Sequence, residues 1–255
     1  MTGTVYLVGA GPGAPDLLTL RAARLLQQAD IVFYDALVHP DTVLLADKAQ
    51  RIAVGKRCGR HSTAQRFINK RLVDAARKYA TVVRLKGGDP MVFGRAHEEI
   101  EVLRAANIAF SIVPGVTAAL AASADLQIPL TQRGQNRSLT FVTPRQASDG
   151  CENHWVNNVL ATDTAAIYMG IGQAAEISAA LLNAGCPAQT PVAVVENASL
   201  PDVRRLFTTL EELPHIAHLT ITGPALILLG SQFVCSRTDS SSVESPGNPG
   251  RAINQ

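Results

Sequence analysis

The chain has 255 residues, of which 47% are hydrophobic and 17% are charged, so it carries enough apolar mass for an ordinary core in one large domain or two small ones. No apolar run approaches the ~18–20 residues of a membrane helix, and the N-terminus lacks a basic, signal-like segment. These features exclude a membrane-spanning helix and favour a cytoplasmic protein.

The cysteines and histidines show no metal-ligand spacing. The four cysteines lie far apart and form no C-x-x-C pair: Cys58, Cys151, Cys186 and Cys235. This spacing favours reduced thiols over disulfides or a zinc site, which agrees with a cytoplasmic location. We therefore expect no metal.

Short apolar runs alternate with helical patterns in the first half of the chain. Strands are expected at Val5–Val8, Ile31–Tyr34, Arg51–Val54, Thr81–Leu85 and Ser111–Val113. Strands separated by helices predict a parallel sheet with crossover connections.

The second half repeats this alternation. Strands are expected at Leu139–Thr143, Ala165–Tyr168, Val192–Glu196 and Ala225–Leu229, and a helix at Gln173–Ala184. The helix ends before Gly185 and Pro187, an expected stop signal. We predict an α/β fold class with two domains, residues 1–134 and 135–235, followed by a disordered tail over 236–255 that is rich in Ser, Pro and Gly.

A glycine-rich turn follows the first strand. The stretch GAGPGA at 9–14 fits the G-x-G-x-x-A fingerprint of a dinucleotide site, and Asp35 ends the next strand about 20 residues on, where a ribose-binding acid would lie. However, Pro12 and Pro15 have no N–H to offer a pyrophosphate. The turn therefore favours a ligand with little negative charge over NAD.

Two more loops follow strands of the same predicted sheet. RLKGGDPMVFGRAHEE at 84–99 contains a tight turn in which Asp89 can cap the turn or accept hydrogen bonds from a ribose. VPGVTAALAASA at 113–124 ends a strand, turns at Gly115, and starts a helix of small residues that Thr117 can cap. Because all three loops follow parallel strands, we expect them to converge at one edge of the sheet.

Eight motifs in order extend this pattern over residues 4–235. They are VGAGPGAPDLLTL, IVFYDALV, VGKRCGRH, VRLKGGDPMVFGR, VPGVTAALAASA, IPLTQRG, IYMG and PVAVVENAS. Together they resemble the S-adenosylmethionine-dependent uroporphyrinogen-III C-methyltransferases of sirohaem and cobalamin synthesis, in the tetrapyrrole methyltransferase family. The resemblance implies two α/β domains with a cofactor cleft between them, a homodimer, and no further module before the methyltransferase.

The resemblance also implies the reaction and its residues. Carbons 2 and 7 of uroporphyrinogen III are methylated in turn to give precorrin-2, without a metal and with S-adenosylhomocysteine as the second product. The implied donor-binding residues are Pro12, Gly87, Gly88, Asp89, Val92, Thr117, Ala118, Met169, Ala198 and Ala225. For proton handling it implies Asp35 as acceptor and Lys56 as donor, with Arg95 and Glu98 as further catalytic candidates.

A basic stretch suits a substrate with several acetate and propionate arms. Eight cations and no carboxylate occur from Lys48 to Val73. Arginine pairs well with carboxylates, so we expect Arg57, Arg60 and Arg133 to bind these arms. Such a stretch is also compatible with a solvated helix face. Nucleic acid is disfavoured, because few aromatic residues are interleaved and the isoelectric point is only about 8.4.

Three departures from the family pattern concern the substrate side. Ala96-His97 replaces two glycines, Gln132 replaces a histidine, and Pro144-Arg145 replaces Gly-His. Transfer of a methyl group from S-adenosylmethionine is therefore a firmer expectation than the identity of the acceptor. The alternatives are another precorrin C-methyltransferase, an NAD-dependent oxidoreductase, and a tetrapyrrole carrier without catalytic activity.

Overall fold

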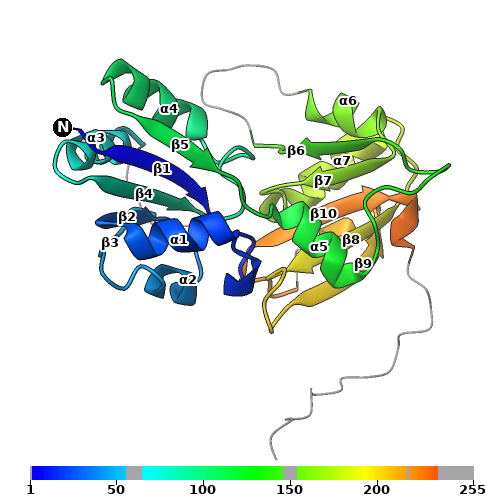
Figure 1. Cartoon of the computed structure of the whole chain (residues 1–255). Helices are drawn as coiled ribbons and strands as arrows, with labels where there is room; N and C mark the ends of the chain where they lie inside the picture. The colour runs from blue at the N-terminus through cyan, green and yellow to red at the C-terminus, as the bar shows by residue number, and fades with distance from the viewer. Residues whose placement is uncertain (1, 56–64, 146–153, 217–218, 235–255) are drawn as a thin grey trace, which may run out of the picture.

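In a computed structural model the chain forms two α/β lobes that lie side by side (Figure 1). The structure describes residues 2–55, 65–145, 154–216 and 219–234. The predicted tail and three of the four cysteines lie outside these residues, and Cys186 is not in a disulfide. No helix in the described ranges has the length and apolar character that a membrane span requires.

The first lobe is built on a parallel five-stranded sheet. Its strands are β1 (Thr4–Gly9), β2 (Ile31–Tyr34), β3 (Gln50–Ala53), β4 (Thr81–Lys86) and β5 (Phe110–Val113). The order is β3-β2-β4-β1-β5, and every neighbouring pair is parallel. The predicted strands and their parallel arrangement are confirmed, with small differences at the strand ends.

Helices cover both faces of this sheet. Helices α1 (Leu20–Gln28) and α2 (Pro40–Leu44) pack on one face, and α3 (Gln65–Ala76) and α4 (Ala96–Ala105) pack on the other. Thr19 begins α1, because its hydroxyl accepts a hydrogen bond from the Ala22 N–H at 3.2 Å. Since helices protect both faces, only the strand ends are left to form a site.

The second lobe has a mixed five-stranded sheet. Its strands are β6 (Leu139–Val142), β7 (Thr164–Ile167), β8 (Pro191–Glu196), β9 (Arg204–Thr209) and β10 (Ala225–Gly230). The order is β6-β7-β10-β8-β9, and only β6 and β7 run parallel. Strand β9 was not predicted: it is an edge strand, half-exposed along its length, so it has no continuous apolar run.

Helices and short 3₁₀ turns complete this lobe. On one face of the sheet pack α6 (Trp155–Leu160), α7 (Ala174–Asn183) and α8 (Leu213–Ile216), and α7 confirms the predicted helix. The described part of the chain also contains the 3₁₀ turns η1 (Pro15–Leu17), η2 (Ile171–Gln173) and η3 (Ser231–Phe233).

Helix α5 (Ala118–Leu126) covers the opposite face of the second sheet. Its small side chains explain the close fit, since Ala119 and Ala122 are fully buried among residues of β7, β8 and β10. The chain thus crosses between the lobes directly after β5 (Figure 1). The boundary at 134/135 stays a prediction, with α5 before it in sequence and packed on the second sheet.

Enlarging a side chain at this contact will destabilise the protein. We expect Ala122→Leu to lower the free energy of unfolding by about 1–3 kcal/mol, because the tightly packed face has no room for the added atoms. Urea denaturation measures the change. Ala124→Leu is the matched control, because Ala124 is exposed on the same helix, and an equal loss in both variants would contradict the packing described here.

Candidate functional site

Three loops meet backbone to backbone at the carboxyl edge of the first sheet. The Gly88 N–H donates to the Gly11 carbonyl at 2.7 Å, and the Gly11 N–H donates back at 3.2 Å. A Cβ on Gly115 would stand 2.4 Å from the Gly88 carbonyl oxygen and 2.9 Å from Gly9 Cα. Only glycine permits this approach. The predicted convergence of the loops after β1, β4 and β5 is confirmed.

Asp89 fastens two of these loops together. Its Oδ1 accepts a hydrogen bond from the Met91 N–H at 2.7 Å, and its Oδ2 accepts one from the Gly115 N–H at 2.9 Å. Asp89 therefore caps its own turn and links the β4 and β5 loops. Next to it, Gly88 has φ of +67° and no heavy atom within 4 Å of the place a Cβ would take, so the loop faces open space.

Three N–H donors of the glycine-rich turn, those of Ala10, Gly11 and Ala14, are already in use. The Ala10 N–H donates to the Lys86 carbonyl at 2.7 Å, and the Ala14 N–H donates to Ser199 Oγ of the second lobe at 2.9 Å. Leu200 lies against Gly13, with its Cγ 2.9 Å from where a Cβ would stand. A pyrophosphate would have to displace these contacts, so the fingerprint is not a dinucleotide site here.

Tyr168, directly after β7, joins the second lobe to the first. Its hydroxyl lies 2.7 Å from Thr117 Oγ1 and accepts a hydrogen bond from the Ala119 N–H at 3.2 Å. Its ring contacts those of Phe93 and Phe141, with centroids 5.0 and 5.6 Å away. Burial raises the pKa of Tyr168, although both hydrogen bonds oppose the rise.

The prediction that the Thr117 side chain caps α5 is wrong. Thr117 occupies the N-cap position, but its hydroxyl pairs with Tyr168 and does not cap the helix. The Tyr168 hydroxyl takes that role by accepting from Ala119. Beside Tyr168, Met169 has a positive φ of 56° and a side chain that is 43% exposed.

Glu196, at the end of β8, shapes the loops around two further predicted residues. It is 1% exposed, and its Oε1 accepts hydrogen bonds from the N–H groups of Thr222 and Gly223, both at 2.7 Å. Arg204 donates to Oε2 at 2.8 Å. Burial alone would raise the pKa of Glu196, but these donors together lower it. The buried Ala198 follows two residues on, and Ala225 pairs with Glu196 in the sheet.

The remaining donor-side residues lie on the same loops. Pro12 and Val92 are half-buried in the β1 and β4 loops, Gly87 begins the latter, and Ala118 is the first residue of α5. The chain thus brings glycine backbone, small side chains and a methionine to the meeting of the two lobes.

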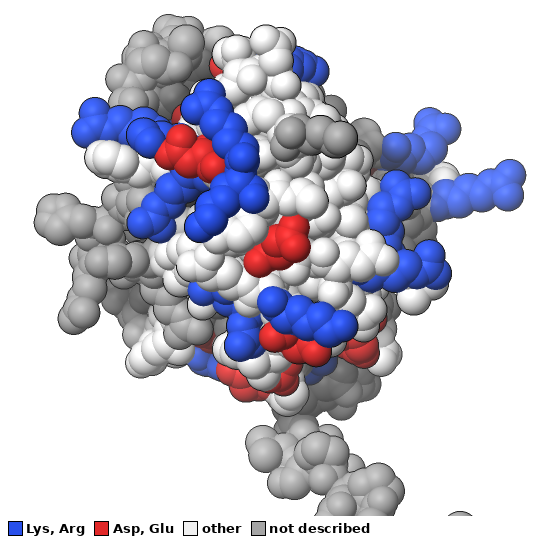
Figure 2. All heavy atoms as spheres, turned by 60° about the vertical axis from the view of Figure 1, so that its left-hand side comes forward, with Lys and Arg blue, Asp and Glu red and all other residues white. Residues whose placement is uncertain are grey.

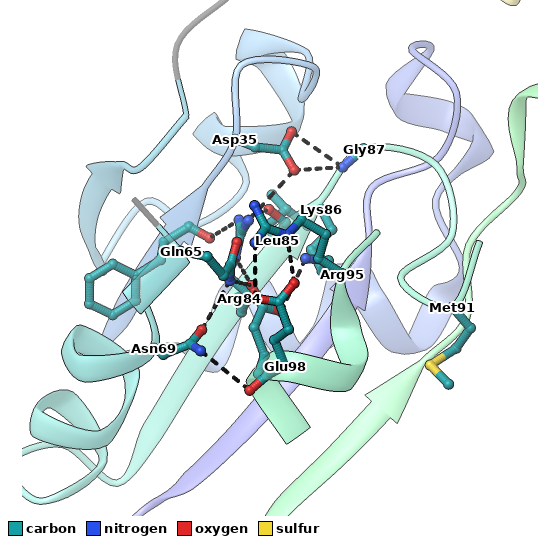
Figure 3. A network of polar contacts seen from close by, with 12 residues as sticks. Asp35, Gln65, Asn69, Arg84, Leu85, Lys86, Gly87, Met91, Arg95 and Glu98 are labelled. Atoms are coloured by element: carbon teal, nitrogen blue, oxygen red, sulfur yellow. Dashed lines mark hydrogen bonds and ion pairs between the residues drawn. The ribbon is translucent and has the colours of Figure 1, made fainter. Parts of the chain in front are cut away.

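Asp35 lies at the end of β2, beside the β4 loop (Figure 3). Its carboxylate accepts hydrogen bonds from the Leu37 N–H at 3.1 Å and the Gly87 N–H at 3.3 Å, and one oxygen lies 3.8 Å from Arg84 Nη2. The side chain is 24% exposed, so a ligand above the sheet edge can reach it.

Arg95 and Glu98 face each other at the start of α4. Two guanidinium N–H groups donate to the Glu98 carboxylate at 2.7 and 2.9 Å, and Arg95 adopts a left-handed φ of 54°. The hydrogen bond from Arg95 lowers the pKa of Glu98, and the same contact raises that of Arg95. In the structure each of these side chains has the other as its partner.

A buried charged cluster below Asp35 was missed by the sequence reasoning. Glu99 accepts hydrogen bonds from Arg84 Nε and Lys86 Nζ, both at 3.0 Å, and all three side chains are at least 95% buried. The available signal was Arg84 inside the predicted strand Thr81–Leu85 with Lys86 directly after it, since charges buried in a strand need partners. Figure 3 shows Arg84 and Lys86 beneath the Asp35 loop.

The basic residues are placed only in part. Lys56, Arg57 and Arg60 lie outside the described residues, although both flanks reach the site: Gly55 packs on Asp35, and Gln65 donates to Glu99 at 3.1 Å. Exposed cations lie on α3 and directly after it: Arg66, Lys70, Arg71, Arg77 and Lys78. Figure 2, which brings the first lobe forward, shows cations and carboxylates interspersed on this face.

Arg133 does not lie near the other predicted residues in this chain. It is exposed in the turn Gln132–Asn136, which Asn136 fastens to Ser231 and Gln232 after β10. That is the end of the second sheet opposite Tyr168. Its predicted role in substrate binding stays a prediction.

The comparisons with known proteins agree with this geometry. Residues 4–214 match the tetrapyrrole (corrin/porphyrin) methylases, so the chain belongs to that family. It is 50% identical over 229 residues to siroheme synthase 1 of Yersinia enterocolitica, and 47% identical over 230 residues to a siroheme synthase of Chromobacterium violaceum. Each match covers 89% of this chain but only 48% and 49% of the relative, so the chain spans about half of their length.

Solved structures with the same fold cover nearly the whole chain. The uroporphyrin III C-methyltransferase of Thermus thermophilus is 39% identical, with a TM-score of 0.78, and the match covers 90% of this chain and 98% of that one. The same protein in complex with S-adenosylhomocysteine matches equally well. A cobalt precorrin-4 methyltransferase is 29% identical, with a TM-score of 0.80, over 91% of this chain and 96% of that one.

Removing the Tyr168 hydroxyl will loosen the start of α5 on the second sheet. We expect Tyr168→Phe to lower the free energy of unfolding by about 1–2 kcal/mol, because Thr117 and the Ala119 N–H lose their shared partner in a half-buried place. Amide exchange at Ala119 should accelerate. Tyr79→Phe, which removes an exposed hydroxyl bond to Gln50, should change neither quantity appreciably, and equal effects in the two variants would contradict this role.

Glu196 makes part of the stability depend on pH. Because its folded-state pKa lies below the ordinary 4.5, its contribution is full above that value and disappears as the pH falls through the lowered one. We expect Glu196→Gln to lose about 1–3 kcal/mol at pH 7 and progressively less toward pH 3. Denaturant melts across this range measure the difference. A difference from wild type that stayed constant with pH would refute the charge-based explanation, and Glu211→Gln on the surface is the control.

Proposed function

We propose that this chain transfers methyl groups from S-adenosylmethionine to carbons 2 and 7 of uroporphyrinogen III, giving precorrin-2 for the synthesis of sirohaem or cobalamin. The observation that carries the proposal is the fold shared, at 39% identity, with the uroporphyrin III C-methyltransferase of Thermus thermophilus, whose chain is covered to 98%. The complex of that protein with S-adenosylhomocysteine supports the choice of donor.

The residues where the lobes meet fit such a donor. Gly88 faces open space, Asp89 holds its loop rigid, and the Met169 side chain is soft and accessible. S-adenosylmethionine supplies a methyl group already activated by the positive charge of its sulfonium. The protein therefore has to hold and orient the donor, which it would do through the ten residues Pro12, Gly87, Gly88, Asp89, Val92, Thr117, Ala118, Met169, Ala198 and Ala225.

Proton handling belongs to the other side of the site. Asp35 is the proposed acceptor, because its carboxylate is oriented by two backbone N–H groups and remains partly accessible. Lys56 is the proposed donor, and Arg95 and Glu98 at the start of α4 are further catalytic candidates.

The cations assigned to the substrate arms are Arg57 and Arg60; Arg133, the third predicted cation, lies away from the other predicted residues, at the end of the second sheet opposite Tyr168. Arginine pairs with carboxylates through two parallel hydrogen bonds, which suits acetate and propionate arms. The described residues on either side of 56–64 lie at the site, where Gly55 contacts Asp35 and Gln65 donates to Glu99. We further propose a cytoplasmic homodimer that binds neither nucleic acid nor membrane.

The activity of another precorrin C-methyltransferase is the nearest alternative. The likeness to a cobalt precorrin-4 methyltransferase, with a TM-score of 0.80, favours it as a second candidate. An NAD-dependent oxidoreductase is disfavoured by the use of the Ala10, Gly11 and Ala14 N–H groups within the protein.

Binding and turnover test the proposal together. We expect calorimetry to detect micromolar affinity for S-adenosylhomocysteine and none for NAD or NADP. With uroporphyrinogen III and the methyl donor, the purified chain should yield the chromophore of precorrin-2 or its oxidised form. Asp35→Asn should lower kcat at least about 100-fold with unchanged affinity for S-adenosylhomocysteine, as expected for loss of a general base.

Asp47→Asn is the matched control, because Asp47 is exposed beyond α2 and away from the sheet edge. It should leave both measurements unchanged. Binding of NAD, or full turnover by Asp35→Asn, would contradict the corresponding part of the proposal.

A further inference from the structure

The proposed function leaves three buried charges without a role. Glu99 is fully buried on α4, and Arg84 and Lys86 are each 4% exposed on β4. Glu99 receives three hydrogen bonds, from Arg84 Nε at 3.0 Å, Lys86 Nζ at 3.0 Å and Gln65 Nε2 at 3.1 Å. Burying charges is unfavourable unless they are paired, so this arrangement constrains the geometry around it.

Arg84 extends the cluster toward the site. Its Nη1 donates to the Leu85 carbonyl at 2.9 Å and to the Phe33 carbonyl at 3.5 Å, and its Nη2 lies 3.8 Å from Asp35 Oδ2. Among the described residues, Glu99 and Asp35 are the only carboxylates within ion-pair distance of Arg84. The two anions therefore share one guanidinium.

Polar side chains of α3 connect the cluster to the start of α4. Gln65 also donates to Asn69 Oδ1 at 3.0 Å, and Asn69 Nδ2 donates to the Glu98 carbonyl at 3.3 Å. Figure 3 shows Asn69 and Gln65 on the side of the cluster away from Met91. The cluster thus joins the end of β2, strand β4 and the starts of α3 and α4, where Asp35, Arg95 and Glu98 are placed.

We propose that Glu99 is a positioning residue, which through Arg84, Lys86 and Gln65 fixes Asp35 relative to the Arg95–Glu98 pair without touching either ligand. The proposal rests on the proposed function, because it concerns the groups assigned to proton handling. It assigns Glu99 to the tetrapyrrole side of the site, since its contacts stop short of the loops that carry Thr117 and Met169.

The response to losing this charge differs between the two cations. Burial lowers the pKa of Lys86, and the positive charge of Arg84 lowers it further, whereas Glu99 opposes both effects. Without Glu99, Lys86 can therefore lose its proton. Without Glu99, Arg84 has Asp35 as its remaining anion and should draw it away from the Gly87 N–H.

Glu99→Gln in the full chain tests this role. We expect kcat for uroporphyrinogen III to fall at least tenfold, with a smaller change in KM and a Kd for S-adenosylhomocysteine within twofold of wild type. Glu101→Gln is the matched control, because Glu101 lies two residues along α4 and pairs with His97 at the surface. It should keep wild-type values throughout.

The double variant Lys86→Met with Glu99→Gln separates positioning from general stability. It removes one cation with the anion, so we expect it to recover thermal stability while kcat stays at least tenfold low. Recovery of kcat to within threefold of wild type would overturn the proposal. So would a full kcat in Glu99→Gln, or a loss of donor affinity in both variants as large as the loss of kcat.

The wild-type chain distinguishes this failure from a failure of the proposed function. If wild type binds S-adenosylhomocysteine but does not methylate uroporphyrinogen III, the proposed methyl acceptor is wrong. The role of Glu99 in placing Asp35 for that reaction is then refuted as well. If wild type turns over and Glu99→Gln matches it, only the positioning role is refuted.

Discussion

The site depends on the contact between the backbones that follow β1, β4 and β5. Gly9 and Gly115 approach each other and the Gly88 carbonyl so closely that a Cβ added to either would meet main-chain atoms, which cannot move aside as a side chain can. Asp89 then uses both carboxylate oxygens to hold the β4 and β5 loops together. This rigid edge is the surface against which the second lobe places Tyr168.

Different physical interactions organise the two sides of the site. On the side of Thr117 and Met169, the contacts are backbone hydrogen bonds, small residues and aromatic rings, and the charged groups that take part accept bonds from main-chain N–H. On the side of Asp35, two buried cations are both paired with Glu99 within the first lobe, and Arg84 also lies near Asp35. Under the proposed function, the side of Thr117 and Met169 binds the methyl donor, and the side of Asp35 transfers a proton of the polycarboxylate substrate.

Much of the fold was predictable from local pattern. The nine predicted strands could be recognised because each is an apolar run bounded by turn residues. Helix α7 could be recognised because Gly185 and Pro187 mark its end. Strand β9 escaped prediction because an edge strand does not need an apolar run. The capping of α5 by Tyr168 rather than by Thr117 also escaped, since the two residues are 51 positions apart.

The parallel sheet of the first half, the glycine loops at its edge and the family resemblance could all be read from the sequence, because they follow from local spacing and from residue types at fixed positions. The strand order, the internal use of the Gly11 and Ala14 N–H groups, the link that Asp89 makes between two loops, and the pairing of Glu99 with Arg84 and Lys86 became visible in the folded chain alone. The physical reason is that a hydrogen-bonding group is satisfied by whichever partner packing brings within about 3 Å, and packing joins residues that the chain keeps far apart.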